Sequence, residues 1–425
     1  MINTAYFKNK KITVIGLARS GLCVGRLLSK LGAEVSVTDR KDNEITRANA
    51  QELAPSVLRI ELGGHSEGFI QGRDIVILSP GVPLDVPPVR WARAAGIPVI
   101  SEIEAGWIVC PASIIAVTGA NGKTTATTLI GEVIKASGRK AFVCGNIGNP
   151  FCGEVERIGP DDYVVLEVSS FQLETIERFR PAISVILNMT PNHLDRYKDM
   201  NEYISAKKRI FMNQDADDYL VLNGDDAVLK SAAQEAGARV RFFGREKNYN
   251  LNQSAVMTVG SILGIERSVC EDVFKRFKGI EHRMEQVAEI RGVSFINDSK
   301  ATTADSAIWA LKDLSRPIIW IAGGRHKGID YRVVLSHARG KVKQVIVIGE
   351  AGPLIREALG GEFSVQDAAS LEDAVTAAFG KAQPGDCVLL SPMCSSYDMF
   401  HDYEERGRVF KKAVLGLEKS RANSV

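Results

Sequence analysis

The first informative absence in this 425-residue sequence is that of paired cysteines. The seven cysteines are scattered, odd in number and form no CxxC pair. The sequence therefore predicts neither a disulfide framework nor a cysteine-bound zinc site. Cys387 and Cys394 flank a predicted strand end, where packing explains them better than metal binding does. Reduced thiols of this kind are typical of cytoplasmic proteins, and we expect that location.

A strong excess of one charge and a long apolar run are also missing. The formal net charge is only +2, so electrostatics give no reason to expect binding to nucleic acid or to a membrane surface. No apolar run reaches the roughly 18 residues of a membrane span, and the N-terminal segment lacks the apolar core of a signal peptide. Internal repeats, low-complexity tracts and long linkers are absent too. The length predicts about two to four domains.

A glycine loop between a strand and a helix is the strongest positive feature. The apolar run from Ile114 to Val117 predicts a buried strand, and Gly119 and Gly122 follow it. Lys123 then begins a helical pattern that ends near Lys135. Glycines let backbone N–H groups surround a triphosphate, and the helix N-terminus contributes about half a positive charge. The pattern predicts a nucleotide site.

Two side chains at the mouth of this helix have the chemistry that such a site needs. Lys123 would reach the β- and γ-phosphates, and the hydroxyl of Thr124 would bind Mg²⁺. The strict Walker spacing requires a glycine five residues before Gly122, where Val117 stands. A short GKT sequence can also occur by chance as a loop and helix cap. The strand before it and the helix after it favour the nucleotide interpretation.

The N-terminal 40 residues form a predicted strand–helix–strand unit with a glycine turn from Gly16 to Gly21. The middle glycine of a dinucleotide fingerprint is replaced by Ala18, and Asp39 stands where an acid would hold a ribose or a base. This turn is compatible with NAD, with a purely structural turn, or with another phosphate-bearing ligand such as a UDP-sugar. A second loop, Ser79–Gly81, follows a strand at the position where α/β sheets bind ligands.

Three further residues in the middle of the chain are candidates for the same site. Glu167 lies near the end of the buried strand Val164–Val168, where a carboxylate needs a cation; Mg²⁺ or a core Lys or Arg would serve. His193 lies on a polar loop after the next strand, where a histidine is more often functional than structural. Lys207 lies on a helix predicted from Asn201 to Met212, and its spacing alone does not distinguish it from its basic neighbours.

The last third of the chain again alternates strands and helices. Three of its strands end in loops rich in Lys, Asp, Ser or Thr, at 298–302, 324–328 and 391–400. Because the carboxyl ends of parallel strands share one edge of a sheet, we expect a composite site at that edge.

Seven motifs, taken in chain order, resemble those of the Mur ligase family. They are TGANGKTT, LEVSSFQLE, NMTPNHLDRY, YISAKKRIF, EHRME, INDSKATT and LSPMCSSYDMFHDYEERG, and they span essentially the whole chain. SSFQLE and the last two motifs most resemble the members that add D-glutamate. The resemblance implies an α/β fold with three domains: a Rossmann-like UDP-sugar-binding domain (1–102), a P-loop ATPase-like central domain (103–280) and a Rossmann-like, amino-acid-binding C-terminal domain (281–425).

The resemblance also implies the activity, an ATP-dependent amide ligase of peptidoglycan precursor synthesis. Its substrates would be ATP, UDP-N-acetylmuramoyl-L-alanine and D-glutamate, with no nucleic acid and no membrane insertion, and the chain would act as a monomer. The motif matches assign the UDP-substrate to Gly16, Ser20, Gly21, Asp39, Arg40, Ser79, Pro80, Gly81, Asn146 and Ser169. They assign ATP to Gly119, Asn121, Gly122, Lys123, Thr124, Thr125, Asn250, Arg283 and Asp298. They assign D-glutamate to Lys300, Thr302, Lys327, Ser396 and Tyr403.

A centre with two Mg²⁺ ions is implied in the same way. Thr124 and Glu167 would bind one ion and His193 would help bind a second. Lys207 matches the lysine that the family carbamylates with CO₂, which supplies the hard oxygen ligands that Mg²⁺ prefers. Carbamylation requires the neutral amine, so we expect burial near cations to depress the pKa of Lys207. The catalytic residues would be Lys123, His193, Lys207 and Asp298.

Three positions depart from the family pattern. Tyr249-Asn250-x-x-Gln253 stands where the family has His-Asn-x-x-Asn, the stretch 226–248 is short and lacks small strands, and Tyr403 replaces a phenylalanine. The first two leave the contacts to the ATP base open. Another Mur ligase, a folylpolyglutamate synthase-like ligase, a non-catalytic UDP-sugar-binding relative and, from the first glycine turn alone, a nicotinamide dehydrogenase remain as alternatives.

Overall fold

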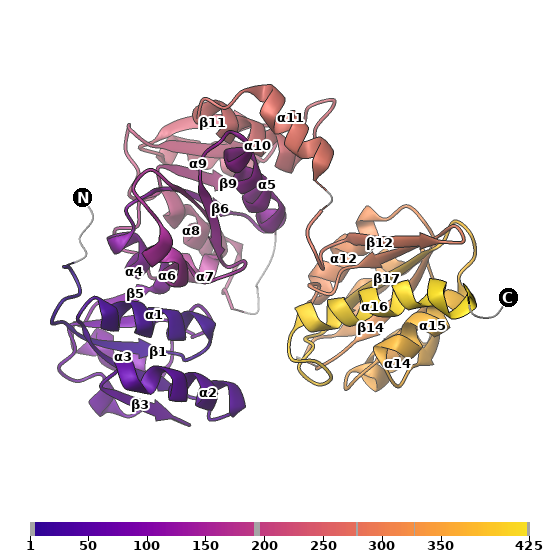
Figure 1. The fold of residues 1–425 in the computed structure, drawn as a ribbon, viewed down its shortest axis with the longest axis horizontal. Helices are drawn as coiled ribbons and strands as arrows, with labels where there is room; N and C mark the ends of the chain where they lie inside the picture. The colour runs from indigo at the N-terminus through magenta and orange to yellow at the C-terminus, as the bar shows by residue number, and fades with distance from the viewer. Residues whose placement is uncertain (1–4, 191–195, 278, 327, 423–425) are drawn as a thin grey trace. The chain divides into compact units, whose positions relative to one another are not determined.

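The computed structural model describes residues 5–190, 196–277, 279–326 and 328–422, with side chains given up to residue 417. The chain forms two compact units, 1–277 and 278–425, and contains three separate sheets (Figure 1). Within the described ranges, no helix combines the length and the apolar character needed to cross a bilayer.

The N-terminal sheet is fully parallel, with strand order β3-β2-β1-β4-β5. The order reverses at β1, so the loops after β1 and β4 meet at the switch point where such sheets bind ligands. These are the loops predicted to hold the UDP-substrate. The elements are β1 (Lys11–Ile15), α1 (Arg19–Lys30), β2 (Glu34–Asp39), α2 (Glu44–Leu53), β3 (Arg59–Leu62), β4 (Ile75–Leu78), α3 (Pro87–Ala94) and β5 (Val99–Ser101).

The central sheet is also parallel, with strand order β11-β10-β9-β6-β8-β7. β6 lies in its middle, between β8 and β9, which places the glycine loop beside the end of β8. The strands are β6 (Ser113–Thr118), β7 (Ala141–Gly145), β8 (Tyr163–Glu167), β9 (Ile183–Ile186), β10 (Tyr219–Asn223) and β11 (Arg239–Phe243). The helices are α4 (Glu102–Val109), α5 (Lys123–Ala136), α6 (Phe151–Glu154), α7 (Ser170–Leu173), α8 (Met200–Lys208), α9 (Ala227–Ala232), α10 (Leu251–Ile262) and α11 (Arg267–Arg276).

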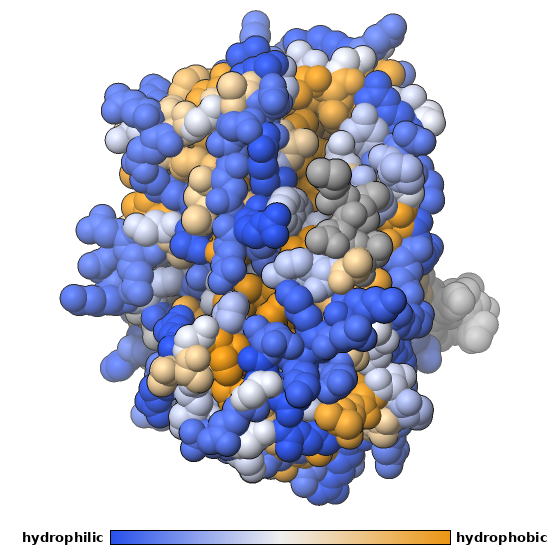
Figure 2. All heavy atoms as spheres, turned by 90° about the vertical axis from the view of Figure 1, so that its left-hand side faces the viewer, coloured by the Kyte–Doolittle hydropathy of each residue, from blue (hydrophilic) through white to orange (hydrophobic). Residues whose placement is uncertain are grey.

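One hydrophobic cluster joins the first two sheets. It contains Val24 and Leu27 from α1, Ile103 from α4, Phe151 from α6 and Leu166 from β8, all buried. This shared core explains why residues 1–277 form one compact unit although they contain two sheets. Figure 2 shows one face of this unit, where hydrophilic side chains predominate and apolar ones lie between them in separate areas, as on an ordinary solvent-facing surface.

The C-terminal sheet has the order β12-β13-β17-β14-β15-β16, parallel except for the β12–β13 pair. One apolar cluster packs α12 and α14 on one face and another packs α15 and α16 on the other. β13, β17 and β14 are neighbours, so the three polar loops predicted to meet do leave adjacent strands. The elements are β12 (Glu285–Ile290), β13 (Val293–Asn297), α12 (Ala304–Asp313), β14 (Ile318–Gly323), α13 (Leu335–Ala338), β15 (Val342–Ile348), α14 (Gly352–Leu359), β16 (Ser364–Asp367), α15 (Leu371–Lys381), β17 (Cys387–Met393) and α16 (Tyr403–Ala422).

The predicted α/β class and the three-sheet organisation are therefore confirmed. The domain limits 1–102, 103–280 and 281–425 stay a prediction. The helix predicted from Asn201 to Met212 is shorter than expected: α8 ends at Lys208 and continues as the 3₁₀ turn Arg209–Phe211. The stretch 226–248 holds α9, one 3₁₀ turn and β11.

Candidate active site

The glycine loop after β6 has the backbone geometry of a phosphate-binding loop. Gly119 has φ +151° and Gly122 has φ +81°, and Gly122 is the N-cap of α5 without a capping side chain. A Cβ at Gly122 would lie 2.4 Å from Oδ1 of Asn252, on α10. Only glycine fits this left-handed, closely packed position. The N–H groups of the first turn of α5 are thus presented without a side-chain cap, as anion binding requires.

Two side chains hold this loop. Asn188, at the end of β9, accepts hydrogen bonds through Oδ1 from the N–H groups of Ala120 (3.0 Å) and Asn121 (2.9 Å). Its Nδ2 donates to the Asn121 carbonyl at 3.0 Å. Lys123 Nζ donates to the carbonyls of Gly119 (3.0 Å) and Ala120 (2.9 Å). These hydrogen bonds preorganise the loop. Asn188 follows β9 and supports the loop, a role that was not predicted from the sequence.

Three predicted ligand residues of the magnesium centre are buried around the loop. Thr124, Glu167 and Lys207 are each at most 2% exposed. Lys207 Nζ donates to the Gly119 carbonyl (2.9 Å) and to Thr118 Oγ1 (3.2 Å). Burial, and next the charge of Lys123, hold the pKa of Lys207 well below its usual value, against an opposite effect of Glu167. The predicted depression of this pKa is confirmed, and it makes the neutral amine available. His193 lies outside the described residues.

Glu167 contacts a residue predicted to bind the UDP-substrate. Its Oε1 accepts a hydrogen bond of 2.7 Å from Asn146 Nδ2, from the loop after β7. Asn146 thus lies beside the magnesium candidates. Ser169, two residues after Glu167, caps α7 in a reciprocal pair with Gln172.

The predicted UDP loops meet at the switch point of the N-terminal sheet. Ser79 Oγ donates to the Gly16 carbonyl at 2.9 Å, and a Cβ at Gly16 (φ +95°) would lie 2.9 Å from the Ser79 Cβ. Asp39 accepts from the N–H groups of Leu17 (2.6 Å) and Lys41 (2.7 Å). The glycine turn and the loop 79–81 are therefore held together by a hydrogen bond and by close packing. A small pocket next to it is lined by residues that include Ser79, Pro80, Phe171, Gln172 and Arg196.

The helix α10 begins with the residues that depart from the family pattern. Asn250 caps α10 in a reciprocal pair with Gln253, so Gln253 preserves the helix start. Tyr249 donates through its hydroxyl to Glu271 Oε1 at 2.7 Å, on α11. These contacts keep α10 in place behind Gly122.

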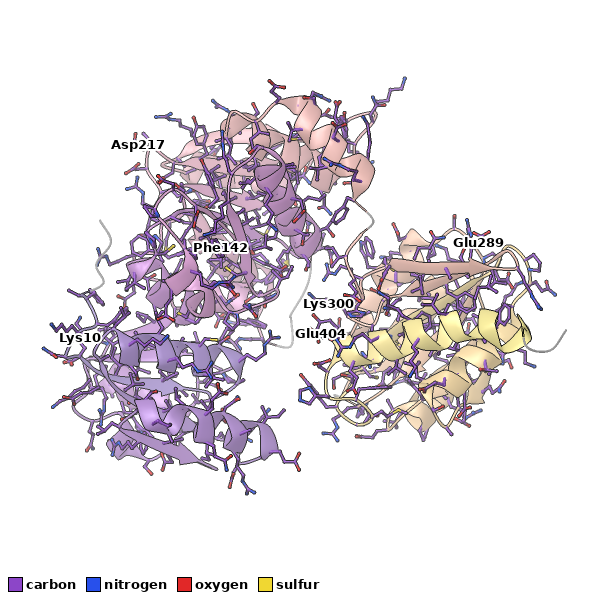
Figure 3. The ribbon with its side chains drawn as sticks, in the orientation of Figure 1. Lys10, Phe142, Asp217, Glu289, Lys300 and Glu404 are labelled. Carbon is purple, nitrogen blue, oxygen red and sulfur yellow. The ribbon has the colours of Figure 1, made fainter. Side chains whose placement is uncertain are left out.

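In the C-terminal unit, Asp298, Lys300 and Thr302 follow the carboxyl end of β13, and Ser396 follows that of β17. Asp298 Oδ2 accepts from Ser391 Oγ at 2.9 Å, and burial raises the pKa of Asp298 to about 7. The Lys300 ammonium lies 5.7 Å from the centre of the Tyr403 ring. Figure 3 labels Lys300 and Glu404, the residue after Tyr403, at the same end of this unit. Ser396 is buried, and Lys327 lies outside the described residues.

Arg406 is a structural residue of this region that the sequence did not single out. It is fully buried and donates to the Ser299 carbonyl (2.8 Å), to Ser299 Oγ (3.0 Å) and to the Cys394 carbonyl (3.1 Å). Burial lowers its pKa to about 10. It fastens the loop after β13 to the loop after β17. In the sequence, Arg406 occupies an ordinary position of the helix α16, so its role becomes visible only in the folded structure.

Glu281, His282 and Glu285 form the group of three potential metal ligands found among the described residues. Lys411 Nζ lies 2.9 Å from Glu281 Oε1 and 2.6 Å from Glu285 Oε1. The single Lys411 ammonium pairs with both carboxylates, so these residues form an ion-pair network.

Comparison with known proteins agrees with this arrangement. Three family models match: the Mur ligase MurD-like N-terminal domain over residues 10–101, the Mur ligase middle domain over 117–271, and the Mur ligase glutamate ligase domain over 282–394. A Pelotomaculum thermopropionicum protein is 43% identical over 97% of this chain and 99% of its own, and a Thermoanaerobacter protein is 40% identical over the same shares. Both are named UDP-N-acetylmuramoylalanine--D-glutamate ligase.

Solved structures show the same fold. The ligase MurF from Thermotoga maritima, solved in complex with ADP, aligns with a TM-score of 0.59 at 15% identity, over 98% of this chain and 97% of its own. The UDP-N-acetylmuramate-alanine ligase MurC from the same organism aligns with a TM-score of 0.58 at 18% identity, over 96% and 100%.

The chain is therefore a member of the Mur ligase family. Within the family it groups with the relatives that carry the D-glutamate ligase name, as the resemblance of its motifs predicted.

Proposed function

We propose that this chain is an ATP-dependent, ADP-forming ligase that joins D-glutamate to UDP-N-acetylmuramoyl-L-alanine in peptidoglycan precursor synthesis. The observation that carries the proposal is the buried Lys207 beside Glu167 and the glycine loop, in a chain about 40% identical over its length to proteins of that name. The alternative of a nicotinamide dehydrogenase has no support in a chain that belongs to this family.

The reaction needs an activated carboxylate. In the first step, a carboxylate oxygen of the acceptor forms a bond to the γ-phosphorus of ATP, the bond from that phosphorus to the β–γ bridging oxygen breaks, and ADP leaves. In the second step the D-glutamate amine attacks the acyl carbon, the bond to the phosphate oxygen breaks, and inorganic phosphate leaves with the amine proton lost to solvent or a base. Lys123 and the N–H groups at the start of α5 offset charge on the transferring group.

The magnesium centre proposed here uses this chain's own oxygen donors. Thr124, Glu167, His193 and a carbamylated Lys207 would hold two Mg²⁺ ions, which supply charge neutralisation for the phosphates. The fit is supported by the burial of Lys207 and its lowered pKa, because a neutral amine reacts with CO₂ and an ammonium does not. Conversion to a carbamate would turn this neutral amine into an anion near the Lys123 ammonium, which favours the carbamate electrostatically.

The two organic substrates are assigned to two different sets of loops. The loops around Gly16, Asp39 and Ser79, together with Asn146, would bind the UDP-substrate. Lys300, Thr302, Lys327, Ser396 and Tyr403 would bind D-glutamate, whose carboxylates require cations and hydrogen-bond donors. We further propose that the chain acts as a cytoplasmic monomer.

An amino-acid panel tests this function. Purified protein with ATP, Mg²⁺ and UDP-N-acetylmuramoyl-L-alanine should release phosphate only when D-glutamate is added, and Lys123→Ala should abolish the release. Release that depends on L-lysine instead of D-glutamate would refute the choice of substrate. ATP binding without any release would identify a non-catalytic relative.

A further inference from the structure

Three buried or half-buried side chains form a hydrogen-bonded row behind the loops assigned to D-glutamate. His326 Nδ1 lies 3.0 Å from the Tyr331 hydroxyl, and that hydroxyl lies 3.2 Å from Cys394 Sγ. Tyr331 is 2% exposed and Cys394 is 1% exposed. His326 follows β14, Tyr331 begins the 3₁₀ turn Tyr331–Val334, and Cys394 follows β17. The row therefore links two loops that leave neighbouring strands.

The direction of these hydrogen bonds follows from the backbone. The N–H of Gly328 donates to His326 Nε2 at 3.0 Å, so Nε2 carries no proton and the neutral imidazole carries its proton on Nδ1. Nδ1–H then donates to the Tyr331 oxygen, which leaves the Tyr331 O–H available to donate to Cys394 Sγ. Burial, and next Cys394, raise the pKa of Tyr331, so the phenol keeps the proton that this bond needs.

A backbone hydrogen bond also joins the two loops, closer to the sheet. The Arg325 N–H donates to the Ser395 carbonyl at 2.8 Å, and a Cβ at Gly324 would lie 2.3 Å from that same carbonyl. On its other side, the Cys394 carbonyl accepts from Arg406 at 3.1 Å. Cys394 is thus held through its backbone by Arg406 and through its side chain by Tyr331. The second contact is the one that reaches across to the loop after β14.

We propose that Tyr331 is a positioning residue for the amino-acid substrate, because it fixes the spacing between residues 324–326, which follow β14, and the loop 391–396. This inference rests on the proposed function, in which those loops bind D-glutamate. Tyr331 is buried and acts only through His326 and Cys394. Without the Tyr331 hydroxyl, its hydrogen bonds to Cys394 Sγ and His326 Nδ1 are lost, while the backbone hydrogen bond from Arg325 to Ser395 remains.

The experiment compares steady-state kinetics of Tyr331→Phe with those of the wild type. The KM for D-glutamate should rise about three- to tenfold, the range that loss of one buried hydrogen bond gives. The KM values for ATP and the UDP-substrate should stay within twofold. Tyr219→Phe is the matched control: the Tyr219 hydroxyl lies 3.4 Å from Arg239 Nη1 in the other unit, and all KM values of this variant should match those of the wild type.

A second pair of variants keeps the test independent of how well Tyr331→Phe folds. Cys394→Ala should raise the KM for D-glutamate as Tyr331→Phe does, whereas Cys394→Ser, which keeps an acceptor for the phenol, should raise it less. In the double variant Tyr331→Phe/Cys394→Ala, the KM should not exceed that of the more affected single variant, because both changes remove one contact.

Two results would overturn the inference. One is a KM for D-glutamate within twofold of the wild type in both Tyr331→Phe and Cys394→Ala. The other is an equal rise in the KM of all three substrates, which a merely structural role would produce. If the wild-type protein itself fails to use D-glutamate, the proposed function is wrong and the inference is refuted with it.

Discussion

At the scale of single residues, Lys207 and Glu102 show what burial does to ionisable groups in this chain. Burial, and next the charge of Lys123, lower the pKa of Lys207 and so disfavour its charged form. Glu102 is fully buried at the start of α4, and burial raises its pKa to about 7. Its Oε1 accepts from the Cys152 N–H at 2.7 Å, while no described residue hydrogen-bonds Oε2. Lys207 and Glu102 each give a prediction that can be measured.

Replacement of Lys207 tests the carbamate. Lys207→Ala should lower ligation roughly 100-fold or more, the order of magnitude that loss of one charge-stabilising group costs. Acetate or formate should restore part of the activity by supplying the missing carboxylate. Lys208→Ala is the control, because Lys208 pairs with Glu235 away from the loop, and its activity should be normal. Full activity in Lys207→Ala, or no response to short carboxylates, would remove the carbamate from the account.

The raised pKa of Glu102 predicts that the free energy of unfolding depends on pH. The folded state holds the Glu102 proton more tightly than the unfolded state, where the pKa is near 4.5. The raised pKa of Glu102 therefore contributes about 3 kcal/mol to the free energy of unfolding at low pH. This contribution is fully present below pH 4.5 and is lost as the pH rises through about 7. Glu102→Gln should unfold in urea with a flatter pH dependence between pH 5 and 8 than the wild type. The exposed Glu132→Gln should follow the wild type; parallel curves for Glu102→Gln would contradict the assignment.

The sequence revealed some of these residues but not others. Lys123 and Glu167 were predictable because a glycine loop and a carboxylate in an apolar strand are visible in the order of residues. Lys207 was distinguished from Lys208 only by family resemblance, since burial depends on how α8 packs. Arg406, Asn188 and Tyr331 act through partners distant in the chain, and spacing along the chain does not encode such contacts.

At the scale of elements, the strands could be predicted nearly completely. Parallel strands buried on both faces are continuous apolar runs, such as 114–117 and 164–168, and each is followed by a turn signal. The end of α8 could not be predicted, because the change to a 3₁₀ turn at Arg209 accompanies contacts with other segments. Arg209 donates to the carbonyls of Leu173 (2.8 Å) and Ile176.

The turn before β9 depends on one carboxylate. Glu104, on α4, accepts from the N–H groups of Glu177 (3.0 Å) and Phe179 (2.8 Å) through Oε2, and from that of Arg178 (2.9 Å) through Oε1. Glu104→Gln retains one acceptor oxygen but turns an amide N–H₂ toward at least one of these donors. We expect the free energy of unfolding to fall by about 1–3 kcal/mol.

Urea unfolding followed by circular dichroism measures this effect. The exposed Glu177→Gln serves as the control, since only its backbone takes part in the turn, and it should unfold as the wild type does. Equal stability of Glu104→Gln and the wild type would show that the three hydrogen bonds contribute little.

At the scale of the whole molecule, the apolar clusters decide which parts can fold alone. Residues 278–425 have clusters on both faces of their own sheet, whereas the N-terminal sheet shares its main cluster with the central sheet. The length predicted about two to four domains, and the family resemblance implied three. The sequence could not predict that the first two share a core, since that depends on which apolar faces meet.

Two fragments test this difference. Residues 278–425 should fold alone, with a cooperative urea transition and dispersed amide resonances. Residues 1–101 should not unfold cooperatively, because they lose the partners of Val24 and Leu27. A cooperative 1–101 fragment together with an unfolded 278–425 fragment would contradict this division.

The central claim is that a carboxylate is activated by phosphorylation and then joined to D-glutamate. Its most direct test uses UDP-N-acetylmuramoyl-L-alanine labelled with ¹⁸O in the alanine carboxylate. After turnover with ATP and D-glutamate, mass spectrometry should find one ¹⁸O in the released phosphate and one in the amide product. Phosphate without ¹⁸O, or a labelled product that forms with L-lysine and not with D-glutamate, would contradict the account.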